Sequence, residues 1–418
     1  MFTADITVNS SRLQADLEEL AGIGRAEDRS IYRMAFTEAD MQARRWLQDK
    51  LRTAGLEAEM DGAGNVFGKF PDRPDEPSVM IGSHLDTVPA AGPLDGALGV
   101  VAGLECLRRI KEENLHPDRA PVELVAFSDE EGRFDGGFFG SRAVRGSLIP
   151  QLIHEAADFD GTTLVEAMTS AGLEPLAALA ARRPPGSIRS YLELHVEQGA
   201  VLDSLGLPVG IVENITGLFR WQIRLIGKAD HAGTTPMGMR CDAFQGLAEF
   251  AGEIPRILEE NDGEESVATI GFIRLLPGTV NTVPGEVEFS LDIRDIDRQV
   301  LDQLADTFRR ALSAIARRRG LMFEFQELSS VEPVACDRKI VEAVSSSVES
   351  LGIEAHRMNS GAGHDAQVMA EIVPAGMVFV PSVGGRSHSI AEWTHVEDIV
   401  AGANVTLRTL LQLASTER

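Results

Sequence analysis

The sequence predicts an α/β fold, in which helices flank a mainly parallel, mixed sheet and a smaller α+β domain is inserted into the chain. Strand, helix and strand patterns alternate near the N-terminus, which is typical of a βαβ unit and a parallel sheet. From about residue 219 the order changes to βαββαβ, the split βαβ pattern of a ferredoxin-like domain, and the alternation resumes after it. We therefore expect a larger domain formed by residues 1–212 and 329–418, with an inserted domain at 213–328.

The elements of the first part follow from hydrophobic periodicity. Leu13, Leu17 and Leu20 recur at the spacing of one helix face, and a second helix is expected at 39–54, with Gly55 as its stop. Further along, the pattern indicates a hairpin at 57–70, a strand at 79–81, a helix at 98–110, a strand at 122–127 and a strand that runs into His195.

The rest of the chain is assigned in the same way. In the inserted domain, strands are expected at 219–226, 267–275, 287–294 and 322–328, and helices at 242–258 and 297–319. After it we expect a helix at 339–351, a strand at 377–381 and a closing helix at 396–413.

Composition excludes several classes of protein. The chain has 418 residues, enough for two or more domains, and its 39 basic and 64 acidic residues leave a net charge of −25. Nucleic acids and anionic membranes attract clustered Lys and Arg, so we expect neither as a partner. No run reaches about 18 apolar residues, and the first twenty residues lack a signal-peptide pattern. The three cysteines are far apart and fit a reducing compartment, so a cytoplasmic protein is expected.

The stretch from Gly82 to Asp95 concentrates groups that bind metals. An apolar strand leads into His84, Asp86 and Asp95, and imidazole and carboxylate suit zinc and similar divalent ions. Asp86 lies two residues after His84, and on a strand such residues point the same way, so Asp86 can hold His84 from behind. The alternative is a polar strand end followed by a turn, and this stretch alone leaves both open.

Similar groups follow other predicted strands. Functional groups of a parallel sheet gather beyond the carboxyl ends of its strands. A site with two neighbouring metal ions needs a shared carboxylate, for which Asp95 is suited, and Glu130 is suited to act as a general base beside Glu131. Without the histidines, the acidic run 129–131 would be interpreted as a solvated turn. The five candidate ligands are His84, Asp95, Glu131, His195 and His388.

A series of motifs carries a resemblance to a known family. In chain order they are GSHLDTV at 82–88, LDG at 94–96, EEG at 130–132, ELHVEQG at 193–199, HAGTTPM at 231–237, NTVPG at 281–285, DIR at 292–294, SGAGHD at 360–365 and SHS at 387–389. Over nearly its whole length the chain thereby resembles the hydantoinase/carbamoylase family of amidohydrolases, a branch of the co-catalytic metal aminoacylase/carboxypeptidase superfamily. That family includes N-carbamoyl-L-amino acid hydrolases, β-ureidopropionases and allantoate amidohydrolases.

The resemblance implies a fold, an activity and a cofactor. The fold would be zinc exopeptidase-like, with the inserted domain as lid and dimerisation domain. The activity would be metal-dependent cleavage of the carbamoyl or ureido C–N bond of an N-carbamoyl-L-amino acid or a related ureido acid. The five ligands would hold two zinc or manganese ions, with Asp95 bridging, Glu130 as general base and Asp86 supporting His84.

The resemblance also implies substrate contacts and an assembly. His231 would stabilise the oxyanion in the site of the partner subunit, which implies a homodimer. Arg294 would bind the substrate carboxylate, and its planar fork matches that group. Arg294 is otherwise a strand-end surface charge, His231 a residue of its polar turn, and Asn281 a structural turn residue. The substrate-binding candidates are Gln198, Asn281, Arg294 and Gly363.

One departure from the family affects the substrate. Family members often read EEGSRF, whereas this chain reads EEGRF from Glu130 to Phe134, one residue shorter. The ligand and the base are unaffected, but the loop that follows them differs, so the substrate stays open. The alternatives are an allantoate-type amidohydrolase, a dipeptidase or aminoacylase, and a non-catalytic metal-binding protein. Glu130 and His231 argue against the last, because binding alone needs neither.

Overall fold

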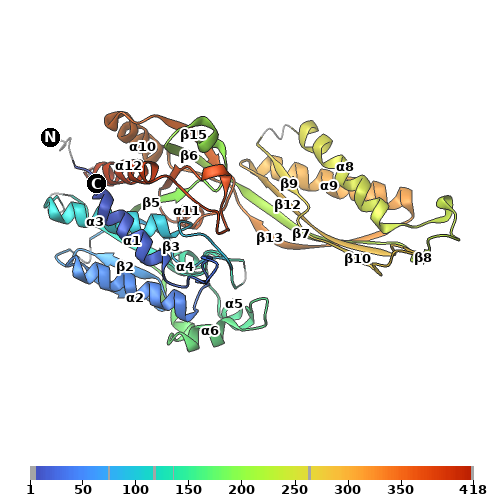
Figure 1. Cartoon of the computed structure of the whole chain (residues 1–418), viewed down its shortest axis with the longest axis horizontal. Coiled ribbons are helices and arrows are strands. Elements are labelled where there is room, and N and C mark those ends of the chain that lie inside the picture. Colours follow the sequence, from blue (N-terminus) through green and yellow to red (C-terminus); the bar gives the residue numbers. More distant parts are fainter. Residues whose placement is uncertain (1–5, 74–75, 116–118, 135, 262–264, 416–418) are drawn as a thin grey trace. The chain divides into compact units, whose positions relative to one another are not determined.

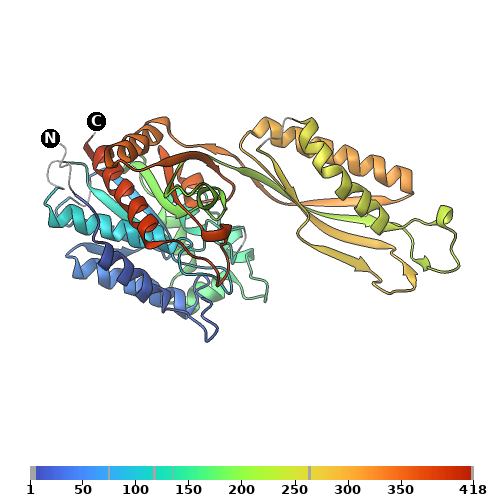
Figure 2. The same cartoon turned by 45° about the horizontal axis from the view of Figure 1, so that its top comes forward.

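The computed structural model describes residues 6–73, 76–115, 119–134, 136–261 and 265–415. The chain divides into a larger unit, Met1–Glu213 with Cys336–Arg418, and an inserted unit, Asn214–Ala335 (Figure 1, Figure 2). The first boundary lies next to the expected residue 212. The second lies beyond the expected residue 328, because the last long strand of the insert continues to Val331 before the chain returns.

The larger unit is built on a mixed sheet. Within the described residues it has nine strands, in the order β1-β2-β4-β3-β5-β16-β6-β14, with β15 paired to β6. Neighbouring strands among β4, β3, β5 and β16 are parallel, and β1, β2, β6 and β14 pair antiparallel with their neighbours in the order above. The α/β prediction is confirmed, with the parallel strands at the centre of the sheet. The strands are β1 (Glu57–Met60), β2 (Val66–Lys69), β3 (Ser78–His84), β4 (Val122–Phe127), β5 (Ile188–Val196), β6 (Val209–Ile215), β14 (Val334–Ala335), β15 (Ala355–Ser360) and β16 (Ala375–Val380).

Helices cover this sheet, and β3 and β4 are consequently buried along their whole length. The helix α3 packs on β3 and β4, and α12 packs on β16 and β5. Side-chain caps define several helix starts: Asn9, Thr37 and Asp337 each accept a hydrogen bond from a main-chain N–H of the first turn. The long helices are α1 (Ser10–Ala21), α2 (Glu38–Thr53), α3 (Ala97–Glu112), α10 (Arg338–Leu351) and α12 (Val396–Ser415).

The segment from 139 to 181 forms short helices that the periodicity did not predict. They bury Phe139, Ile153, Leu164 and Met168 in a separate small core, so packing rather than a long amphipathic repeat stabilises them. No single helix in the described part of the chain is long and apolar enough to span a membrane; α6 and η1 reach that length and composition only as a pair bent by 91°. The short helices of the larger unit are α4 (Phe139–Arg145), α5 (Pro150–Glu155), α6 (Leu164–Ser170), η1 (Pro175–Ala181), α7 (Val201–Leu205), α11 (Asp365–Met369) and η3 (Val383–Gly385).

The inserted unit has the expected βαββαβ order. Its sheet runs β10-β12-β7-β13, with β9 also on β12, and α8 and α9 pack on its apolar face around Trp221, Phe250 and Phe308. The strand expected at 267–275 is interrupted and forms β9 and β10, and a small pairing of β8 with β11 was not expected. The elements are β7 (Gly217–Ile226), β8 (Asp230–His231), η2 (Met237–Met239), α8 (Ala243–Glu260), β9 (Val267–Thr269), β10 (Ile273–Leu276), β11 (Thr282–Val283), β12 (Glu286–Asp295), α9 (Arg298–Arg319) and β13 (Met322–Val331).

Candidate active site

The site lies beyond the carboxyl ends of the central parallel strands. His84 ends β3, and His195 is the last residue but one of β5. Glu130 and Glu131 follow β4, and His388 follows β16. Because β4, β3, β5 and β16 are parallel neighbours, their carboxyl ends share one edge of the sheet. Residues that are up to roughly 300 positions apart in the chain therefore lie together at this edge of the sheet.

Asp95 stands at the centre of the cluster, and its two oxygens face different groups. Its Oδ1 lies 3.6 Å from His84 Nε2 and 3.3 Å from His195 Nε2. Its Oδ2 lies 3.1 Å from His388 Nε2, which is itself 3.5 Å from Glu131 Oε2. Two ligand groups therefore share this carboxylate, His84–Asp95–His195 and Asp95–Glu131–His388, each with its ligand atoms within 4.8 Å of one another.

A glycine makes the close approach of Asp95 and His84 possible. Gly96 precedes α3 with a φ of 64°, a region that favours glycine. A Cβ at this position would lie 2.4 Å from His84 Nε2. The LDG motif thus places a carboxylate beside the imidazole and leaves no room for a side chain after it.

Burial and mutual charge set the protonation of the cluster. Burial alone would lower the pKa of His84, but Glu130 and Asp95 raise it well above its usual value. Burial raises the pKa of Glu130 well above the usual value. Burial, and then the charge of Asp95, raise the pKa of Glu131 to about 7. The hydrogen bond with Asp95 raises the pKa of His388 to about 9.

These residues fit a divalent cation. The donor set of imidazole nitrogens and carboxylate oxygens is the one that zinc and manganese accept. Glu131 Oε1 is buried and has no hydrogen-bond partner among the described residues, so it is an acceptor that a cation would satisfy. The Nδ1 atoms of His84 and His195 lie 3.0 and 2.9 Å from main-chain carbonyl oxygens, which leaves each Nε2 as the ligand atom.

The support of His84 differs from the expectation. The carbonyl oxygen of Asp86, not its carboxylate, lies 3.0 Å from His84 Nδ1; the carboxylate Oδ1 is 3.9 Å away. The expectation assumed that His84 and Asp86 lie on one strand and point the same way, but β3 ends at His84. The Asp86 carboxylate instead accepts the main-chain N–H of Glu131 at 3.1 Å, so it ties the loop after β4 to the loop after β3.

Comparison with known proteins assigns this arrangement to a family. The model described as Peptidase family M20/M25/M40 matches residues 80–412, a range that contains every one of the five candidate ligands. The chain belongs to this family. The M20 assignment agrees with the predicted resemblance, which is confirmed, and M20 proteins are metal-dependent, as the ligand groups here would require.

Relatives that match over their full length include amidohydrolases. The chain is 39% identical to the N-carbamoyl-L-amino acid amidohydrolase of Geobacillus stearothermophilus, over 98% of this chain and 100% of the relative. It is 33% identical to the allantoate amidohydrolase of Escherichia coli, over 98% of this chain and 99% of the relative. Among solved structures, a hydantoinase/carbamoylase family amidase from Burkholderia multivorans matches with a TM-score of 0.90 and 33% identity, covering 99% of this chain and 100% of that one.

The remaining candidates of this M20 chain lie partly in the inserted unit. His231 in β8 pairs with Thr282 in β11, and Asn281 O accepts the N–H of Ala232 at 2.9 Å, so His231 and Asn281 are neighbours. Arg294 is on β12, and its Nε donates to Asp292 Oδ1 at 2.8 Å. His231 and Asn281 therefore form a pair in the inserted unit, whereas Arg294 is the last residue but one of β12, at the end of that strand away from β11.

Two further candidates lie in the larger unit. Gln198 Nε2 donates to Asp95 Oδ2 at 2.8 Å, so this side chain holds the shared carboxylate. Gly363 follows β15, and a Cβ there would lie 2.9 Å from the Phe138 ring. Gln198 has a φ of 59°, a left-handed conformation that its hydrogen bonds to Ser382 and Asp95 offset.

The shortened loop after Glu131 folds back on Asp129. The Asp129 carboxylate accepts the N–H groups of Arg133 and Phe134 at 2.8 and 3.2 Å. Arg133 in turn donates to Ala35 O at 2.6 Å and pairs with Asp158 at 2.9 Å. The loop is therefore anchored at its start, and the two glutamates keep their place beside the histidines.

Sequence reasoning missed Glu392. This residue is 3% exposed, and its Oε1 accepts the N–H groups of Leu94 and Asp95 at 2.5 and 2.9 Å. Its Oε2 lies 3.3 Å from Ser387 Oγ, which also donates to Asp95 Oδ2 at 2.7 Å. Burial raises the pKa of Glu392 to about 7. No local pattern signals this residue, because its partner is almost 300 residues away in the chain.

Replacing Glu392 by Ala should lower metal affinity about 10- to 100-fold, the usual effect of losing a group that orients a metal ligand. The change removes the acceptor of the Asp95 N–H without removing a ligand. Metal affinity is measured by titration against a competing chelator. The exposed Glu397 on the first turn of α12 gives the matched control, Glu397→Ala, which should change nothing. Equal affinities for both variants would contradict the assigned role.

Proposed function

We propose that the protein is a metal-dependent amidohydrolase that cleaves the carbamoyl or ureido C–N bond of an N-carbamoyl-L-amino acid or a related ureido acid. The observation that carries the proposal is the pair of ligand groups that share Asp95, next to a largely buried glutamate, Glu130. Relatives along the whole chain, named N-carbamoyl-L-amino acid and allantoate amidohydrolases, support the class of bond.

The proposed cofactor is a pair of divalent ions, Zn²⁺ or Mn²⁺, held by His84, Asp95, Glu131, His195 and His388. When bound, two such ions polarise the carbonyl and lower the pKa of water. The shared Asp95 supports a two-ion site, since each of its oxygens faces a separate group.

Glu130 is the proposed general base. Its Oε2 lies 3.5 Å from His84 Nε2, and it belongs to neither of the two groups that share Asp95, although it forms a third possible group with His84 and Glu131. Burial raises the pKa of Glu130. A raised pKa suits a carboxylate that accepts a proton in one step of the reaction and donates it in the next. It would take a proton from the attacking water and pass it to the leaving nitrogen as the C–N bond breaks.

His231 is the proposed oxyanion donor. Its Nδ1 accepts the main-chain N–H groups of Gly233 and Thr234 at 3.1 and 3.3 Å. An accepting Nδ1 places the proton of the neutral ring on Nε2, so the exposed edge of the ring presents a hydrogen-bond donor. Asn281 lies beside it and would add an amide donor, and Arg294 would bind the substrate carboxylate. Gln198 and Gly363 would complete the substrate site in the larger unit.

We also infer a cytoplasmic homodimer in which the inserted unit serves as lid and dimerisation domain. All three cysteines are free, which fits a reducing compartment. The larger unit would supply the metal ligands and the inserted unit the cation for the substrate, so catalysis would need residues of both units to meet around the substrate.

One assay panel tests the function. Metal-loaded protein is given N-carbamoyl-L-amino acids, allantoate and dipeptides, with Zn²⁺ or Mn²⁺ added, and ammonia and amino-acid release are measured. Turnover of the carbamoyl compounds is expected. Preferential turnover of allantoate would indicate an allantoate-type amidohydrolase, and cleavage of dipeptides would indicate a dipeptidase or aminoacylase. No turnover with metal bound would indicate a metal-binding protein without activity.

Replacing Arg294 by Ala should raise KM about 10- to 100-fold with little change in metal content. A hydrogen bond to a charged group contributes about 1.5–3 kcal/mol. The contact of Arg294 with the substrate carboxylate would be present in the bound substrate as well as in the transition state, so its loss should appear in KM. The measurement is steady-state kinetics with an N-carbamoyl amino acid. Arg224→Ala is the control, because Arg224 pairs with Glu286 and Glu324 on the same inserted sheet. An unchanged KM in Arg294→Ala would remove Arg294 from the substrate site.

Replacing His231 by Ala should lower kcat about 10²- to 10³-fold, the usual effect of losing an oxyanion donor. If His231 acts in the partner's site, mixing this inactive variant with inactive Glu130→Gln protein restores part of the activity. A heterodimer then has one site with both defects and one with neither. No recovery after verified subunit exchange would mean that His231 serves its own subunit.

A further inference from the structure

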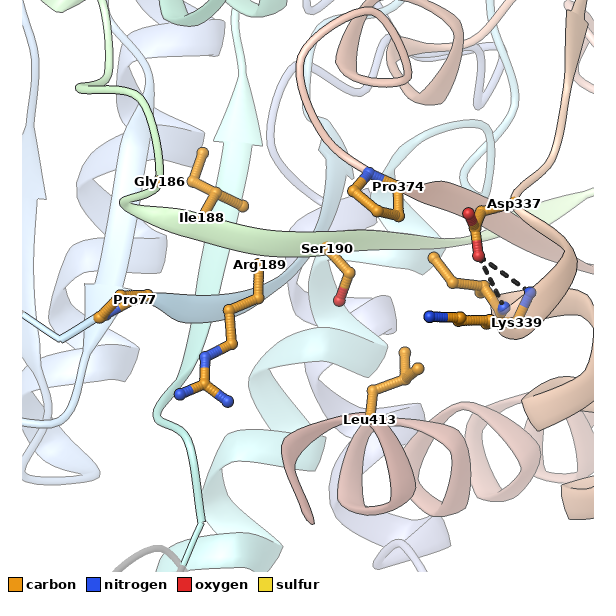
Figure 3. Close-up of a pocket in the computed structure, with 10 residues that line it drawn as sticks. Pro77, Gly186, Ile188, Arg189, Ser190, Asp337, Lys339, Pro374 and Leu413 are labelled. Carbon is orange, nitrogen blue, oxygen red and sulfur yellow. Dashed lines mark hydrogen bonds between the residues drawn. The ribbon is translucent and has the colours of Figure 1, made fainter. Parts of the chain in front are cut away.

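A cavity opens in the larger unit, and none of the candidate metal ligands lines it. Its volume is about 600 Å³, the size of a small-molecule site, and its wall contains Ser190 near the start of β5 and Pro374 directly before β16 (Figure 3). These are the amino ends of the parallel strands, whereas the metal ligands follow their carboxyl ends. The cavity is therefore distinct from the site described above.

Two cations line this cavity without an ion pair. Among the described residues, neither the Arg189 guanidinium nor the Lys339 ammonium has a carboxylate within pairing distance. The acidic residue of the described lining is Asp337, and its Oδ1 is engaged by the N–H groups of Lys339 and Ile340 at 2.9 and 3.3 Å. Since the whole chain carries a charge of −25, a wall with two cations that no described carboxylate pairs is a local exception.

The rest of the wall combines a polar group with an apolar surface. Ser190 is 7% exposed, and its hydroxyl makes no hydrogen bond with the described residues. Figure 3 shows this hydroxyl and the Lys339 ammonium directed toward the same space, with Leu413 across from them. Ile340 and Leu413 provide the apolar part. A ligand that satisfies all of these groups has one anionic end and one hydrocarbon face.

We propose that this cavity binds a small organic anion, a carboxylate or phosphate carried on an apolar body. The anionic group contacts Lys339 and the Ser190 hydroxyl, Arg189 adds positive charge from another part of the wall, and the apolar body lies against Ile340 and Leu413. Such binding stabilises the larger unit, because the unfolded chain lacks the site, and above Kd the stabilisation grows with the logarithm of ligand concentration. The proposal is independent of the reaction catalysed at the metal site.

The test uses the metal-loaded protein and three probes. Isothermal titration calorimetry measures binding of 4-bromobenzoate, 4-bromophenyl phosphate and the neutral 4-bromobenzyl alcohol. At least one anion should bind, and the alcohol should bind at least about tenfold more weakly. Whichever anion binds more tightly identifies the head group. In crystals soaked with that anion, the anomalous signal of bromine should lie beside Ile340 and Leu413.

Variants assign the binding to this cavity. The double variant Arg189→Gln with Lys339→Gln should raise Kd about tenfold or more. Arg338→Gln is the matched control, because Arg338 is the neighbouring cation on α10 but pairs with Glu342 and lies outside the lining. It should leave Kd unchanged, as should Arg294→Ala, which tests binding at the proposed substrate site.

Several results would overturn the proposal. They are an unchanged Kd in the double variant, equal binding of the alcohol, loss of binding in Arg294→Ala, and no binding of either anion at about millimolar concentration. The circular dichroism spectrum and Tm of the double variant should match those of the wild type, since Lys339 is exposed and Arg189 half-buried. Loss of binding in a well-folded double variant with a normal Arg338→Gln control supports the site.

Discussion

Replacing Glu130 by Gln should reduce kcat about 10²- to 10⁴-fold while the protein keeps its full metal content. The amide nearly preserves the shape of the carboxylate but cannot accept the proton of the attacking water. Glu130 is buried next to His84, and the groups that share Asp95 do not include it, so its loss should not empty either of them. Steady-state kinetics and elemental metal analysis on the same sample measure the two effects separately.

Glu131→Gln is the matched control for this result. Glu131 Oε2 lies 3.5 Å from His388 Nε2 in the second ligand group, so its replacement should lower metal content as well as activity. The two glutamates are adjacent in the chain and similarly buried, so general damage to the loop would affect both variants alike. Metal loss in Glu130→Gln with metal retained in Glu131→Gln would mean that the two roles are exchanged.

Replacing Asp95 by Ala should remove both metal ions and abolish activity. Its Oδ1 faces His84 and His195, and its Oδ2 faces His388, so a single substitution weakens both groups. Elemental analysis should give close to zero ions per chain, against the two proposed for the wild type, and added metal should raise the Tm of the wild type but not that of the variant.

Ser387→Ala is the control for Asp95. The Ser387 hydroxyl donates to Asp95 Oδ2 at 2.7 Å, so its loss disturbs the carboxylate without removing a ligand, and metal content should be largely retained. An Asp95→Ala protein that loses one ion and holds the other at wild-type affinity would show that the two groups do not share this carboxylate. The site would then consist of two independent metal centres.

Much of the fold followed from local pattern, and the exceptions have physical causes. The strand into His84 and the helix after Gly96 were predictable, because an apolar run and a helical repeat are properties of neighbouring residues. The short helices around Ile153 and Met168 were not, because each is too short to show a repeat and is stabilised by the core that they form together. The break between β9 and β10 was not predictable either, because the sequence pattern over 267–275 is that of one continuous strand.

The candidate site divides in the same way. The histidines and carboxylates were recognisable because each follows a predicted strand and carries a family motif. Glu392 was not, because its role depends on a contact with Asp95 that no spacing encodes. The support of His84 was assigned to the wrong atoms of Asp86, because where a strand ends decides which way the next side chains point.

The sequence by itself determined the α/β class, the family and the residue types that gather at the strand ends. These depend on periodicity, composition and motifs, which are properties of the sequence itself. Only the tertiary structure decided that the two oxygens of Asp95 face different ligand groups, that Glu392 holds Asp95 by its main chain, and that Arg189 and Lys339 line one cavity. Those facts depend on which strands are neighbours and in what register, and long-range packing sets both.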